Sequence, residues 1–161
     1  MKQHHLSTKF LVFYIFIGVF GFFLVTLGGS YMVERHFEHS LSAALYTEAH
    51  NIASNEAVKN NISSATVDSL QEHLSAIADF QDAVLWIINN NGEIIVSTRK
   101  NIAIDEPIPF DEFDAAKWGS NYYQVGKFYG YFDTDQLSVI APITSDMTTK
   151  GYVAIHYAMT N

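Results

Sequence analysis

The sequence predicts an α+β protein in which an N-terminal transmembrane helix continues into a long helix packed on a five-stranded antiparallel sheet. The helices are predicted by an uncharged apolar segment at residues 10–30, which leads into a helix-forming segment without proline. The sheet is predicted by five β-rich segments in the later part of the chain, two of which flank an Asn-Gly turn. A second helix and an irregular acidic segment complete the expected order of elements.

Residues 10–27 read FLVFYIFIGVFGFFLVTL and contain no charged side chain. At about 1.5 Å of rise per residue, about twenty such residues cross the hydrocarbon layer of a membrane. Apolar side chains occupy every face of this helix, which argues against a buried helix of a soluble core. We therefore expect an uncleaved transmembrane helix over residues 10–30. The alternative is a cleaved signal peptide, which has a shorter apolar core and ends at a small-residue cleavage site.

The charges on either side of this segment predict its orientation. Lys2 and Lys9 precede it without any acidic residue, whereas all seventeen acidic residues follow it together with the seven other basic ones. Basic residues are enriched on the cytoplasmic side of membrane spans. We therefore expect residues 1–9 to form a cytoplasmic tail and residues 31–161 to form one extracytoplasmic domain at the cell membrane.

The composition of residues 31–161 excludes several classes of function. The excess of acidic residues makes nucleic acid an improbable partner, because the phosphate backbone would be repelled. The chain has no cysteine, which excludes disulfides, thiolate chemistry and zinc-thiolate sites. A segment of this length is one ordinary domain, which must be stable through packing alone.

Residues 31–60 are expected to form one long amphipathic helix. They contain no proline or internal glycine, and apolar residues recur at steps of three and four: Phe37, Leu41, Leu45, Ala49, Ile52 and Ala53. This stripe either packs on its own domain or pairs with a second copy of the chain, and we expect a homodimer. A second helix is expected from about Val67 to Asp79, after N-cap candidates among Ser63, Ser64 and Thr66.

The clearest strand signal is a hairpin, in which residues 83–88 and 93–97 flank Asn89-Asn90-Asn91-Gly92. The Asn-Gly pair at its end accommodates the positive φ that tight hairpin turns require. The first strand is apolar on both faces, so both faces of the sheet need cover. Three more strands are expected at residues 122–131, 137–143 and 151–159. The proline-containing segment 101–119 is expected to be a loop that covers one face.

This order of elements resembles the extracytoplasmic PAS-like sensor domains called Cache. The resemblance rests on the hairpin VLWIINNNGEIIVST, on the pair of strands in LSVIAPITSDMTTKGYVAIHYAM, and on the anchor that leads into a long helix. It implies a small-molecule pocket on the sheet face away from the long helix, under the segment between the second and third strands. It also implies a second transmembrane helix and a cytoplasmic output module, so a chain ending at Asn161 is expected to be a fragment.

No catalytic motif occurs in the sequence, so we expect no enzymatic activity and no cofactor in these residues. His36 and His39 lie three residues apart on the long helix, where they are either a metal-binding pair or part of a solvated face. His156 lies in an apolar strand on the same side as Ala154 and Ala158. It is either a core histidine or a pocket residue.

Aromatic residues around the third strand and a few polar ones are the candidates for the ligand pocket, because tyrosine and tryptophan combine apolar area with a polar group. The expected walls are Trp118, Tyr123, Tyr129 and Tyr131, and the expected polar contacts are Arg99, Asp133 and His156. Acidic residues also gather in the irregular segment, where Asp111, Glu112 and Asp114 follow Asp105 and Glu106. They are either a solvated loop or a divalent-cation site, with Asp111, Glu112 and Asp114 as ligands.

Together these features predict a signal-sensing input domain of a membrane receptor, such as a two-component sensor histidine kinase. It would bind a small extracellular ligand and transmit a conformational change through the membrane. The alternatives are a membrane-anchored accessory or protein-interaction domain, and a divalent-cation sensor that uses the acidic segment 105–114.

Overall fold

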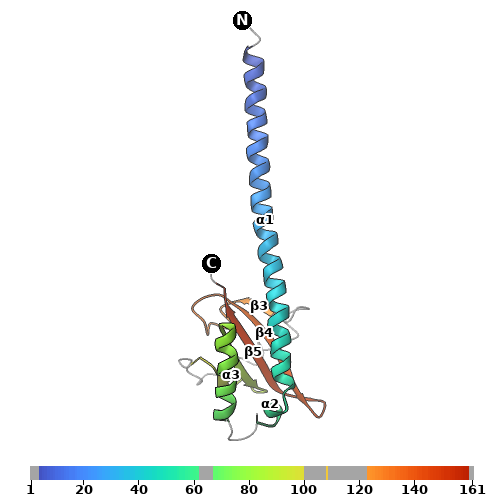
Figure 1. Ribbon diagram of the computed structural model, residues 1–161, viewed down its shortest axis with the longest axis vertical. Coiled ribbons are helices and arrows are strands. Elements are labelled where there is room, and N and C mark those ends of the chain that lie inside the picture. Colours follow the sequence, from blue (N-terminus) through green and yellow to red (C-terminus); the bar gives the residue numbers. More distant parts are fainter. Residues whose placement is uncertain (1–3, 62–66, 100–107, 109–122, 160–161) are drawn as a thin grey trace. The chain divides into compact units, whose positions relative to one another are not determined.

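The computed structural model describes residues 4–61, 67–99, 108 and 123–159. The chain divides into two units, residues 1–39 and residues 40–161, and helix α1 runs from the first into the second. The elements in chain order are α1 (His4–Ser54), α2 (Glu56–Asn61), α3 (Val67–Gln81), β1 (Ala83–Asn89), β2 (Ile94–Ser97), β3 (Tyr123–Gly126), β4 (Gln136–Ser145) and β5 (Thr148–Ala158) (Figure 1).

The first unit is helical, and its large apolar side chains from Phe10 to Leu27 are exposed. Among the residues that the structure describes, this is the one helix long and apolar enough to cross a membrane. Exposed aliphatic and aromatic side chains over a whole helix are stable only where apolar surroundings cover them. The span expected at residues 10–30 lies within this helix and stays a prediction.

The second unit is built on a five-stranded antiparallel sheet with the order β2-β1-β5-β4-β3. The predicted α+β class and the five antiparallel strands are therefore confirmed. Strand β1 lies between β2 and β5, and its residues Leu85–Ile88 are buried. Its side chains leave the sheet in alternate directions, so both faces are covered, as the apolar sequence of this strand predicts.

The helices cover one face of the sheet (Figure 1). This helix-side core joins helical side chains to the residues of the strands that point toward them: Leu45, Ala49, Ile52, Val58, Leu74, Leu85, Ile87, Val139 and Ile155. The predicted apolar stripe of the long helix packs into it from Leu41 onward, whereas Phe37 is exposed. From Leu41 onward, the stripe therefore packs against the sheet of its own chain.

The opposite face carries a second cluster, which we call the aromatic core: Trp86, Ile88, Ile94, Ile108, Phe128, Phe132, Ile140 and Ala154. Ile108 is buried in it, and its backbone N–H donates to the carbonyl of Gly92 at 2.8 Å. One residue of the segment 101–119 therefore lies on the sheet face that this segment was expected to cover. The rest of that segment is outside the described residues.

Two predicted elements end earlier than expected. The long helix was expected to reach residue 60, but α1 ends at Ser54, and the side chain of Asn55 accepts a hydrogen bond from the N–H of Ala57 at 2.9 Å, which begins α2. The third strand was expected over residues 122–131, but β3 ends at Gly126. Phe128 and Tyr129 follow with positive φ of 40° and 53°, a turn conformation that a strand cannot contain.

The candidate ligand-binding site

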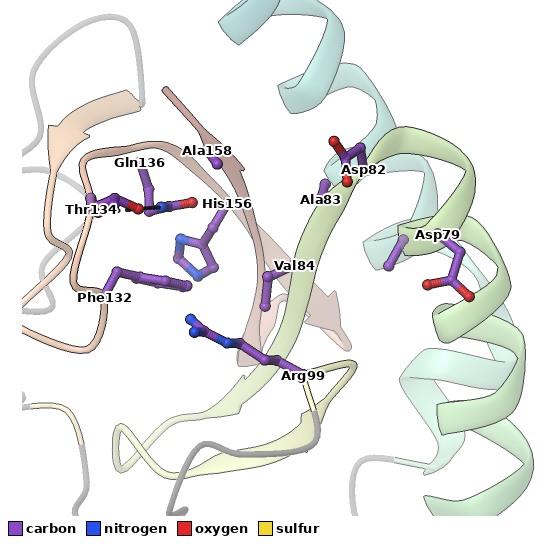
Figure 2. A pocket seen from close by; sticks show the side chains of 11 residues that line it. Asp79, Asp82, Ala83, Val84, Arg99, Phe132, Thr134, Gln136, His156 and Ala158 are labelled. Carbon is purple, nitrogen blue, oxygen red and sulfur yellow. Dashed lines mark hydrogen bonds between the residues drawn. The ribbon is translucent and has the colours of Figure 1, made fainter. Parts of the chain in front are cut away.

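A cavity of about 340 Å³ lies at the end of the sheet where β1 and β4 begin and β5 ends. It opens on the face of the aromatic core and reaches the last turn of α3 (Figure 2). Its lining residues are Ala78, Asp79, Asp82, Ala83, Val84, Arg99, Phe132, Thr134, Gln136, His156 and Ala158. Ligand cavities in proteins typically measure about 300–1,000 Å³, so this one accommodates a small organic molecule.

His156 lies in this wall with a fully buried side chain. The register of the sheet sets it between Val84 of β1 and Ser138 of β4. Its Nδ1 is 2.8 Å from the hydroxyl oxygen of Ser138, while its Nε2 has no hydrogen-bond partner among the described residues. Burial lowers the pKa of His156 to about 3, because the charged form loses its hydration, so the ring is neutral at neutral pH.

Aromatic rings surround this imidazole. The ring centroids of Trp86 and Phe128 are each 4.4 Å from that of His156, in edge-to-face arrangements, and the Phe132 centroid is 4.9 Å away. Phe128 reaches this position through the positive-φ turn after β3. The turn therefore fills the centre of this sheet face with aromatic side chains and leaves the cavity at the ends of the strands.

Arg99 supplies the positive charge of the cavity. It follows β2, and its backbone N–H donates to the hydroxyl oxygen of Ser97 at 3.3 Å. Its guanidinium carbon lies 5.5 Å from the ring centroid of Phe132, within the range of a cation–π contact. Figure 2 shows the guanidinium directed toward the imidazole of His156.

Asp79 and Asp82 supply negative charge at the α3 side of the cavity. The last turn of α3 contains no basic residue, and the free carbonyl groups of a helix C-terminus add further negative potential. Asp82 is the single residue between α3 and β1, and it adopts a positive φ of 50°, which aspartate tolerates better than most residues.

The structure brings together only some of the predicted ligand contacts. Arg99 and His156 both line the cavity. Tyr131 instead packs edge to face on Trp86, at 5.5 Å between ring centroids, and Tyr129 packs on Phe128 at 5.0 Å. Both tyrosines belong to the aromatic core beside the cavity rather than to its wall, and Asp133 is exposed outside it.

The prediction for Tyr123 is wrong, because its side chain packs against the helix-side core. Tyr123 is the register partner of Val139, whose side chain points toward the helices, and paired residues of neighbouring strands share a face. The expected wall residue Trp118 and the expected cation ligands Asp111, Glu112 and Asp114 lie outside the described residues. Within the described part, no group of three acidic or histidine side chains is arranged to hold a metal ion.

Sequence reasoning did not identify Asp79, Asp82, Thr134 and Gln136 as lining residues. The signal for the two acids is the one-residue connection between α3 and β1, which forces the end of the helix against the end of the sheet. Gln136 is the first residue of β4 and the partner of Ala158, and its side-chain amide donates to the hydroxyl of Thr134 at 3.0 Å. Only the register of the sheet identifies this pair.

No protein-family model and no curated protein sequence matches the chain. Among solved structures, the chain is similar to the sensor domain of the V. cholerae histidine kinase DctB, with a TM-score of 0.59 and 15% sequence identity over 84% of this chain and 57% of that one. It is also similar to the sensory domain of the Campylobacter jejuni chemoreceptor Tlp3, with a TM-score of 0.54 and 14% identity over 94% of this chain and 64% of that one.

The chain thus spans about three fifths of the length of these two domains. At identities this low, the similarity shows the fold alone. It says nothing about whether this chain shares the ligands or activities of those two proteins. The resemblance that the sequence shows to receptor sensor domains is confirmed at this level. The chain therefore has the fold of the sensor domains of histidine kinases and chemoreceptors.

Proposed function

We propose that the chain is the signal-sensing input domain of a membrane receptor, most simply a two-component sensor histidine kinase, and that its ligand binds in the cavity beside His156. The observation that carries this proposal is a cavity, in a sensor-domain fold, whose wall contains a buried imidazole. The Nε2 of that imidazole has no hydrogen-bond partner among the described residues. Buried polar atoms are almost always hydrogen-bonded, so this nitrogen is the atom to which a ligand would bind. The absence of a catalytic motif supports a binding role rather than an enzymatic one.

A ligand in this cavity would contact elements that lead out of the domain. Ala158, the last residue of β5, lines the cavity, and the next residue, Met159, donates its backbone N–H to the carbonyl of Asp135 at 3.0 Å. Helix α1 contributes to the helix-side core on the other face of the sheet and continues without interruption into the apolar segment. A ligand that binds one arrangement of these elements more tightly than another would shift the population and displace the chain where it enters the membrane.

The membrane arrangement that accompanies this proposal has residues 1–9 in the cytoplasm, residues 10–30 in the membrane and residues 31–161 outside. The exposed apolar side chains of the first unit and the distribution of charges support it. We also propose that the receptor is a homodimer, because Phe37 and other apolar residues before Leu41 remain exposed on α1.

The reading frame beyond Asn161 tests the receptor proposal. It is expected to encode a second apolar segment of about twenty residues, followed by a kinase or another output module. A stop codon directly after Asn161 would contradict the proposal, and it would favour a membrane-anchored accessory protein.

A further inference from the structure

A groove of about 170 Å³ lies between helices α1, α2 and α3, which cover one face of the sheet (Figure 1). Its lining includes Glu48, Asn51 and Ile52 of α1, Val58 of α2, and Leu74 and Ile77 of α3. Ile52, Val58 and Leu74 are buried members of the helix-side core, and Ile77 packs against that core, so the groove has an aliphatic floor. None of its lining residues lines the cavity beside His156.

Polar and aliphatic groups lie at different ends of this groove. Asn51 and Ile52 come three and four residues after Glu48 on α1, so the three side chains share one face of that helix. The aliphatic side chains of Ile52 and Val58 follow Glu48 along the chain. Asn55 also lines the groove, but its side-chain oxygen accepts a backbone N–H of α2 at 2.9 Å. At the usual rise per residue, Glu48 and Asn55 are about 10 Å apart along the helix axis.

The Glu48 end of the groove is negatively charged. Glu48 is half-buried, and within the described part of the chain its carboxylate has no hydrogen-bond or ion-pair partner. The last turn of α1 contains no basic residue, so the free carbonyl groups at its C-terminus add negative potential. Lys59, the basic residue of α2, is not among the lining residues. A half-buried carboxylate without a counter-charge is suited to a cationic ligand.

We propose that this groove binds a small aliphatic ammonium ion, a primary alkyl amine of about five carbons. The ammonium group would donate to the carboxylate of Glu48 and to the side-chain oxygen of Asn51, and the hydrocarbon chain would lie on Ile52, Val58 and Leu74. A dry cavity of about 150 Å³ holds a benzene molecule, so the volume of this groove is sufficient for such a chain. The inference goes beyond the proposed function, because it adds a second ligand site, in direct contact with α1.

The two ends of the groove exclude related ligand classes. A carboxylate ligand would be repelled by Glu48, and an uncharged alcohol would leave Glu48 without its counter-charge. A diamine would place its second ammonium group on the aliphatic floor or beside Asn55. The oxygen of Asn55 is already bound to α2, so that amide offers only N–H donors, which an ammonium group cannot use.

The test is methyl NMR of the full chain, labelled with ¹³C at isoleucine, in detergent micelles at neutral pH. The methyl groups of Ile52 and Ile77 report on the groove, and those of Ile88 and Ile140 report on the aromatic core. The probes share a five-carbon chain: n-pentylamine, n-pentanol, n-pentanoate and cadaverine. We expect n-pentylamine at millimolar concentrations to cause saturable shifts at Ile52 and Ile77. It should bind about tenfold or more tightly than the other three, because it alone combines the charge-assisted contact with burial of its hydrocarbon end.

Variants of Glu48 and Ile77 test the two ends of the groove. Glu48→Gln should weaken n-pentylamine binding about tenfold and make n-pentylamine and n-pentanol bind alike, whereas Glu48→Asp should keep the preference for the amine. Glu38→Gln is the matched control, because Glu38 is also a half-buried glutamate of α1 but lies outside the groove. Ile77→Phe should fill the groove and abolish the shift at Ile52. Unchanged signals of Ile88 and Ile140 would show that these variants are folded.

Three outcomes would overturn the inference: no saturable shift of Ile52 and Ile77 with n-pentylamine, equal affinity of the parent chain for n-pentylamine and n-pentanol, or unchanged affinity in the Glu48→Gln variant. None of them concerns the cavity beside His156 or the reading frame beyond Asn161. The failure of this inference can therefore be distinguished from the failure of the receptor proposal.

Discussion

The buried imidazole of His156 makes the stability of the domain depend on pH. Burial lowers its pKa in the folded state to about 3, whereas an unperturbed histidine in the unfolded chain titrates near about 6.5. Between these values the unfolded state binds the extra proton, so the free energy of unfolding increases with pH in this window. The stabilisation is complete above the unfolded value and decreases as the pH falls toward 3. We expect this residue alone to cost about 2 kcal/mol of stability between about pH 7.5 and pH 5.

Urea unfolding of the full chain in detergent micelles measures this loss at the two pH values. It can be followed by tryptophan fluorescence, to which the buried Trp86 contributes. His156→Gln should be less stable at both, and it should lose about 2 kcal/mol less than the parent chain on acidification. His50→Gln is the control, because it removes an exposed histidine in place of the buried one. An equally large acid loss in the His156→Gln variant would show that other groups cause it.

Alternation along β5 predicts the side of the sheet on which His156 lies, and the structure confirms that it shares this side with Ala154 of the aromatic core. Sequence reasoning did not predict its partner Ser138, since that contact depends on the register between β4 and β5. The register at this pair is set by a tight turn at Asp146 and Met147, both at positive φ, together with a shift in the pairing between Ile143 and Thr144. Neither residue of the turn is the asparagine or glycine that usually marks such a turn.

At the scale of single elements, the β1–β2 hairpin was predictable because its turn is built from residues that tolerate positive φ. The turn also has a role that its sequence does not reveal. Gly92 accepts the N–H of Ile108, and a Cβ at Gly92 would overlap the carbonyl oxygen of Ile108. The hairpin turn therefore holds one residue of the segment between β2 and β3 against the sheet.

The effect of this contact on stability can be separated from that of backbone strain by comparing Gly92→Ala with Gly130→Ala. The two glycines have nearly equal φ, 83° and 84°, but no atom lies within 4 Å of a Cβ at Gly130. Gly130→Ala should cost about 1 kcal/mol of stability, the strain of the left-handed conformation. Gly92→Ala should cost about 2–3 kcal/mol, because the clash with Ile108 adds to that strain. Equal losses in urea unfolding would mean that Ile108 is not held at the turn.

The third strand shows where strand prediction from residue type fails. Residues 122–131 are rich in aromatic residues, which favours a strand by propensity, yet β3 comprises only Tyr123–Gly126. The aromatic residues that follow turn back and pack on Trp86 and His156. Tertiary packing of large rings thus overrides the local preference, and it places the cavity at the strand ends instead of under the centre of the face.

At the scale of the whole molecule, the second unit contains both cores, and the apolar surface of the first unit is exposed. Deletion of residues 1–30 is therefore expected to yield a soluble, folded domain. Size-exclusion chromatography and a cooperative thermal transition by circular dichroism would verify this. Recovery of only aggregated protein would mean that the apolar segment contributes to the fold and that the expected boundary at residue 30 is wrong.

The sequence predicted the order of elements and the α+β class, because these depend on periodicity and on turn residues within short windows. It predicted two polar residues of the cavity, Arg99 and His156. It did not predict the contribution of Asp79 and Asp82, because their position depends on how α3 meets the sheet. A contact between the ends of two elements leaves no periodic pattern of residues in the sequence from which it could be predicted.

The central proposal is that residues 31–161 form a sensory domain outside the cell, and cysteine labelling tests its location most directly. The chain has no cysteine, so Met147→Cys and Gln3→Cys each introduce one thiol. Met147 lies fully exposed at the tip of the β4–β5 hairpin. In intact spheroplasts, a membrane-impermeant maleimide should label the Met147→Cys protein and leave the Gln3→Cys protein unlabelled until the membrane is permeabilised. Protection of the Met147→Cys protein in intact spheroplasts, followed by labelling after permeabilisation, would place the domain inside the cell and contradict the account.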